Sequence, residues 1–155
     1  MKQILWSVLA ILAAIFVGCV VVGLVELLGL LVYPLPPDLN FNDEAAQKEH
    51  MAGAPPLAMA IVALAWGAGP FAGTLAACAI ARRKYVLHGL IVGVIFAVFD
   101  ALNYFSFPHP IWMMVAGIVF PLLTSSAAAR LAQILFPQKA CSSKPYDMRE
   151  KNMAC

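Results

Sequence analysis

Four long apolar blocks dominate this sequence and limit what it can fold into. A bilayer core is about 30 Å thick and a helix rises about 1.5 Å per residue, so about 20 apolar residues can cross it. Each block reaches that length. We therefore predict an all-α, polytopic membrane protein in which four transmembrane helices form one bundle over residues 1–137, followed by a mobile cytoplasmic tail at 138–155. The expected spans are residues 4–32, 57–81, 85–105 and 111–136.

The composition excludes several classes of protein. Of the 155 residues, 63% are hydrophobic and 12% are charged, whereas soluble domains are about half apolar and about a quarter charged. The net charge of +2 is dispersed at block ends, which argues against a nucleic-acid-binding protein. Four cysteines match neither a disulfide framework nor a zinc spacing. We expect no metal and no cofactor. The cysteines are Cys19, Cys78, Cys141 and Cys155.

The lysines and arginines predict the orientation, because cytoplasmic segments of membrane proteins are rich in them. Nine of the ten fall in segments that share one side of a four-span protein, and only Lys48 falls on the other. Both termini are therefore expected in the cytoplasm, with the acidic first connection, residues 33–56, outside. The first block has 22 uncharged residues from Ile4 to Val25, longer than the apolar part of a secretory signal, so we expect it to be retained.

Small residues recur at every fourth position in the second and third blocks. Such stripes let helix backbones approach closely in lipid. A three-residue link joins the two blocks, so we expect the stripes to face each other, with a homodimer face as the alternative. The helix-packing glycines are then Gly69 and Gly73 in one block and Gly89 and Gly93 in the other.

Two acids lie within the apolar blocks. Glu26 is about seven residues from the outer end of the first block and Asp100 about six from that of the third, which places both roughly 10 Å below the outer surface. Gly23 and Gly29 flank Glu26, and Asn103 can hydrogen-bond Asp100 one helical turn away. We expect the two carboxyl groups to approach each other and to share a retained proton, because two ionised carboxylates are costly in lipid.

Each acid also has a structural interpretation, in which it is protonated, hydrogen-bonded or wetted near the interface. His50 and His109 occur in outer segments but match no known ligand motif, so we predict no metal site there. Trp66 is expected to pack inside the bundle, whereas Tyr33, Tyr104 and Trp112 suit the aromatic belt at the interface.

Four stretches of sequence together resemble a family of small, uncharacterised four-helix bacterial inner-membrane proteins. They are VELLGLLVYPLPP at 25–37, AWGAGPFAG at 65–73, ARR at 81–83 and PHPIW at 108–112. The resemblance covers most of the chain before the tail. It implies four helices in a bacterial inner membrane and carries over no catalytic residues.

Two functions remain open. The leading hypothesis is a non-enzymatic scaffold or accessory subunit whose partners are the bilayer and a second copy or another membrane protein. The alternative is a small proton-coupled transporter that uses Glu26 and Asp100, because carboxyl groups within membranes commonly mark ion pathways. An enzyme is not expected, since no serine or cysteine has a placed base.

Overall fold

The computed structural model describes residues 2–40, 42–106 and 109–137, so the expected tail at 138–155 lies outside the described part. The described residues form five α-helices and no strand, which confirms the all-α class. The helices are α1 (Lys2–Val32), α2 (Glu44–Ala52), α3 (Pro56–Ala81), α4 (Tyr85–Ser106) and α5 (Ile111–Leu135).

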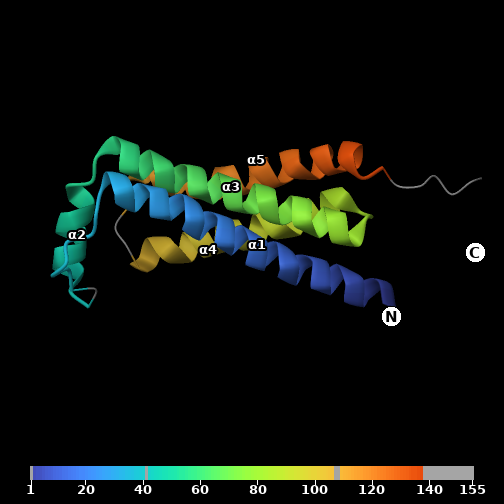
Figure 1. Ribbon diagram of the computed structural model, residues 1–155, viewed down its shortest axis with the longest axis horizontal. Coiled ribbons are helices and arrows are strands. Elements are labelled where there is room, and N and C mark those ends of the chain that lie inside the picture. Colours follow the sequence, from blue (N-terminus) through green and yellow to red (C-terminus); the bar gives the residue numbers. More distant parts are fainter. Residues whose placement is uncertain (1, 41, 107–108, 138–155) are drawn as a thin grey trace, which may run out of the picture.

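Four of the helices, α1, α3, α4 and α5, are long and apolar enough to cross a membrane. They run along the long axis of the molecule, and the short α2 lies across one end (Figure 1). We call this the α2 end and the opposite one the link end, after the α3–α4 link at 82–84. Large apolar side chains such as Leu31 and Ile134 are exposed, as expected for helices that face lipid.

Helix α1 packs mainly against α3, along small residues of both helices. A Cβ atom added at Gly73 would lie 2.5 Å from the backbone oxygen of Ala14, and one added at Gly69 would lie 2.8 Å from that of Gly18. Only glycine allows backbones to approach this closely. The stripe of α3 therefore faces α1.

The glycines of α4 face α5, so the expected pairing of the two stripes is wrong. A Cβ at Gly89 would lie 2.8 Å from the Cβ of Ala129, and one at Gly93 would lie 3.1 Å from the backbone oxygen of Pro121. The spacing of small residues shows which face of a helix lacks bulky side chains. It does not show which neighbouring helix packs on that face. Helices α3 and α4 also touch, and a Cβ at Gly89 would lie 3.5 Å from the Cγ2 atom of Thr74 in α3.

Helix α3 occupies the centre of the bundle, in contact with α1, α4 and α5. Its Trp66 is only 2% exposed, as expected for a packed side chain. The Ser125 hydroxyl of α5 donates a hydrogen bond to the backbone oxygen of Pro70, at 3.5 Å. This hydrogen bond joins the two helices that have an internal proline, Pro70 in α3 and Pro121 in α5. Each internal proline removes one backbone hydrogen bond from its helix.

The first connection contains a helix that the apolar pattern did not predict. Helix α2 has nine mostly polar residues and no buried one. The Asp43 carboxylate caps it by accepting hydrogen bonds from the backbone N–H groups of Ala45, at 2.9 Å, and Ala46, at 3.3 Å. Lys48 and Glu44 form an exposed ion pair one turn apart, at 3.9 Å. Capping and local pairs therefore stabilise α2, without an apolar face.

Candidate functional site

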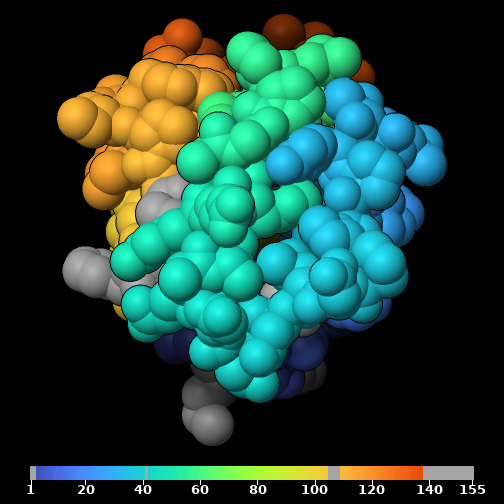
Figure 2. All heavy atoms as spheres, turned by 90° about the vertical axis from the view of Figure 1, so that its left-hand side faces the viewer, coloured from blue at the N-terminus to red at the C-terminus, as the bar shows by residue number. Residues whose placement is uncertain are grey.

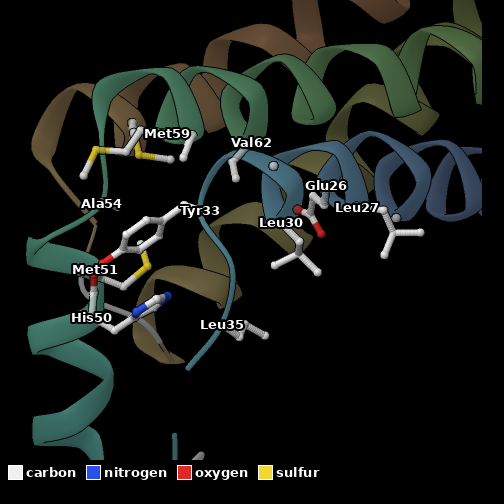
Figure 3. A pocket seen from close by; sticks show the side chains of 14 residues that line it. Glu26, Leu27, Leu30, Tyr33, Leu35, His50, Met51, Ala54, Met59 and Val62 are labelled. Atoms are coloured by element: carbon white, nitrogen blue, oxygen red, sulfur yellow. Dashed lines mark hydrogen bonds between the residues drawn. The ribbon is translucent and has the colours of Figure 1, made fainter. Parts of the chain in front are cut away.

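A pocket of about 360 Å³ opens at the α2 end between α1, α2 and α3. This volume is within the range of small-molecule sites, about 300 to 1,000 Å³. Its walls are mostly apolar. Figure 3 shows Tyr33, His50 and Met51 gathered on one side and Glu26 on the other. The lining residues are Gly23, Glu26, Leu27, Gly29, Leu30, Tyr33, Leu35, His50, Met51, Ala54, Ala58, Met59, Val62 and Met113.

Glu26 is the one acid in this described lining, which has no lysine or arginine. The side chain is half-buried. A Cβ at Gly23 would have no heavy atom within 4 Å, so this part of α1 leaves open space beside the carboxyl group. A carboxyl group in an apolar wall favours a ligand with a positive charge.

Asp100 is only 7% exposed, and its Oδ2 atom has no hydrogen-bond partner among the described residues. Of the two acids predicted to share a depth, Glu26 lies in the pocket wall and Asp100 is buried inside the bundle. Their approach to each other stays a prediction. No hydrogen bond from Asn103 reaches this Oδ2 atom in the described structure, and the expected pairing of Asn103 with Asp100 stays a prediction.

Tyr33 holds α2 against the end of α1. Its hydroxyl donates to the backbone oxygen of His50 at 3.0 Å, and the two rings stack with centroids 4.5 Å apart and planes 19° apart. A Cβ at Gly53 would lie 3.0 Å from the same hydroxyl oxygen. Tyr33 forms one rim of the pocket, and its expected place in the interfacial belt stays a prediction.

Three of the pocket residues are methionines from three different helices: Met51 of α2, Met59 of α3 and Met113 of α5. Methionine is unbranched and polarizable, and it adapts to ligands of varied shape. Met113 is far from Met51 and Met59 in the sequence, so no local motif could have identified the three together. The pocket wall can therefore repack around an apolar body.

A second aromatic group surrounds the end of α4. Trp66 lies 5.9 Å from Tyr104 and 5.5 Å from His109, between ring centroids. The Tyr104 hydroxyl donates to the backbone oxygen of Met114 at 2.9 Å. Tyr104 thus links α4 to α5 instead of serving only as an interfacial anchor. In the described residues, no three His, Cys, Asp or Glu side chains could jointly hold a metal ion.

The surface around the pocket mouth is acidic. Figure 2 looks onto this end, where the segment leading into and through α2, in cyan and teal, covers the middle of the face. Four acids are exposed there against one lysine, Lys48: Asp38, Asp43, Glu44 and Glu49. A neighbouring pocket of about 320 Å³ shares Tyr33 and His50 and is also lined by Asp38 and Glu49. Such a field concentrates cations near the mouth.

The site therefore combines an adaptable apolar wall, one carboxyl group in that wall and an acidic approach, and a second carboxyl group, Asp100, is buried in α4. A mostly apolar wall with one carboxyl group suits a cation with an apolar body. Comparison of the chain with protein families, curated proteins and solved structures gives no match.

Proposed function

We propose that this chain is a non-enzymatic, multi-pass protein of a bacterial inner membrane, and that it is a small proton-coupled carrier of amphipathic organic cations. One observation carries the proposal: Glu26 lines an apolar pocket, and Asp100, a second acid within a membrane-length helix, is buried with an Oδ2 atom that has no hydrogen-bond partner among the described residues. Acids placed within membrane spans are costly to insert, which favours a functional role.

The pocket selects for charge and for apolar surface together. A cation in a mostly apolar cavity needs a counter-charge, and Glu26 is the one acid in the described lining. The body of the ligand then packs on leucine, valine and methionine side chains such as Leu30, Val62 and Met59. A small inorganic cation would lack these contacts, so the proposed substrate carries a single positive charge on an apolar frame.

Proton coupling follows from the two carboxyl groups. Two ionised carboxylates are costly in lipid, so we propose that Glu26 and Asp100 together retain a proton when the site is empty. When a cation binds beside Glu26, both carboxylates can be ionised, and the proton leaves to water. Binding of the cation and loss of the proton are therefore alternatives at one site, which is the requirement for exchange across a membrane.

The proposed placement has the termini in the cytoplasm and the pocket mouth outside, from the nine-to-one distribution of lysine and arginine. In a cysteine-free background, Asn42→Cys places a thiol at an exposed position near α2. We expect it to react with a membrane-impermeant maleimide in intact cells. The native Cys141, kept alone in the same background, should react only after lysis. The reverse labelling pattern would contradict the orientation.

Transport can be tested in vesicles with ethidium, a permanent aromatic cation. Vesicles with an acidic lumen and enclosed DNA report ethidium entry as fluorescence, driven by protons that leave. Vesicles with the parent protein should take up ethidium several-fold faster than empty vesicles, and collapse of the pH gradient should remove the difference. Uptake equal to that of empty vesicles at every pH gradient would refute the carrier.

The position of α1 favours a second candidate function, the scaffold or accessory subunit. It is the least buried of the four long helices, with 17% of its most apolar stretch buried inside the structure. A helix at the edge is available to another membrane protein or a second copy. Stoichiometric recovery of another protein in mild detergent, with no ethidium uptake, would favour this function over the carrier.

A further inference from the structure

A second pocket, of about 250 Å³, lies at the link end between α1 and α4, far from the carboxyl pair. Figure 1 shows α1 separating from α4 toward this end. One part of the lining is polar, with Gln3, Ser7, Arg83, Lys84 and the buried His88. The rest is mostly apolar and extends along both helices, with Ile4, Val8, Ile11, Leu87 and Ile91.

Within the described part of the chain, Arg83 and Lys84 at this end have no carboxylate partner. The acids of the described residues all lie in the half of the molecule that contains the α2 end. They are Glu26, Asp38, Asp43, Glu44, Glu49 and Asp100. The link has Arg82, Arg83 and Lys84 in succession, and no ion pair forms with Arg83 or Lys84 among the described residues. Their charges are therefore available to an external anion.

Hydrogen bonds fix the position of Arg83 in the pocket. Its guanidinium donates to the Gln3 side-chain oxygen at 2.5 Å, to the Gln3 backbone oxygen and to the Ser7 hydroxyl at 3.2 Å. The residues on either side, Arg82 and Lys84, both have left-handed backbone, with φ of 49° and 46°. The tight link thus directs Arg83 toward α1, where a half-buried charge lies beside apolar helix faces.

We propose that this pocket binds an anionic phospholipid, with the phosphate at Arg83 and Lys84 and an acyl chain along the apolar faces of α1 and α4. Basic pockets between membrane helices suit such headgroups. The pocket has cations at one end and an apolar wall beyond them. This combination matches a lipid better than a free phosphate, because a free phosphate would leave the apolar wall uncovered. The inference does not depend on the carboxyl site.

The test compares phosphatidylglycerol with phosphatidylcholine, added to the full-length chain in neutral detergent. Native mass spectrometry counts bound lipids, and thermal unfolding measures stabilisation. Phosphatidylglycerol should bind and raise Tm, and phosphatidylcholine should do so much less. Lys84→Gln and Arg83→Gln should each weaken phosphatidylglycerol binding by about fivefold, the effect of one cation near a membrane surface. Arg82→Gln is the matched control, because Arg82 carries the same charge next to the pocket without lining it.

Three outcomes would overturn the proposal. Equal weakening by Arg82→Gln would show a general surface charge, and equal binding of the two lipids would show no headgroup selection. Equal stabilisation by glycerol phosphate, which has a headgroup but no acyl chain, would show a phosphate site instead of a lipid site. If Arg83→Gln unfolds before lipid is added, Lys84→Gln decides, because the Lys84 side chain has no hydrogen-bond partner in the described structure to lose.

Discussion

Gly73→Ala should destabilise the bundle by about 1 to 3 kcal/mol, the usual cost of overpacking. Its Cβ would lie 2.5 Å from a backbone oxygen of α1, that of Ala14, and a backbone cannot move aside as a flexible side chain can. Unfolding by denaturant in mixed micelles measures the free energy. Gly93→Ala should cost less, since its nearest contact, the backbone oxygen of Pro121, would be at 3.1 Å.

Gly23→Ala is the matched control for these variants. It is also a glycine within a membrane-length helix, but a Cβ there would have no heavy atom within 4 Å. Alanine favours a helix over glycine by up to about 1 kcal/mol, so this variant should be as stable as the parent or more so. If Gly73→Ala were as stable as Gly23→Ala, the close packing of α1 on α3 would be wrong.

Glu26→Gln should weaken ethidium binding at least tenfold, equivalent to about 1.4 kcal/mol or more. The amide keeps the size of the side chain but removes the counter-charge from a mostly apolar pocket. Fluorescence titration in detergent measures the affinity. Glu49→Gln is the control, because it removes an exposed acid of α2 that does not line this pocket.

Equal losses in Glu26→Gln and Glu49→Gln would mean that ethidium responds to the acidic surface alone. Unchanged affinity in Glu26→Gln would remove Glu26 from the site. Asp100→Asn should retain binding, because Glu26 still supplies the counter-charge, but should release fewer protons per ethidium bound. A pH indicator in weakly buffered solution measures that release.

The four long helices of the bundle could be predicted because the length of an apolar run is a local property of the chain. The four blocks became α1, α3, α4 and α5. Helix α2 was missed because it has no apolar periodicity, although Asp43 is a typical N-cap residue at its start. The partners of the glycine stripes were also wrong, because the tertiary arrangement places α3 against α1 through Gly69 and Gly73, and α4 against α5 through Gly89 and Gly93.

The candidate site could be predicted only in part. Glu26 and Asp100 could be singled out because both are acids within apolar blocks and their depths could be counted from the block ends, but their approach to each other stays a prediction. The pocket wall could not be predicted, because Met51, Met59 and Met113 converge from three helices without a shared spacing. His88, buried in α4 with its Nδ1 atom 3.1 Å from the Lys84 backbone oxygen, also carried no sequence signal.

The most direct test of the central claim is an infrared difference spectrum, recorded as ethidium is added to the purified protein at neutral pH. Ethidium contains no carbonyl group, so a change in the protonated-carboxyl band reports the protein. Exchange of a proton for the cation at Glu26 and Asp100 predicts that this band decreases in the parent as ethidium binds. It should not decrease in Glu26→Gln. Saturable ethidium binding by the parent with no loss of the protonated-carboxyl band would contradict the account.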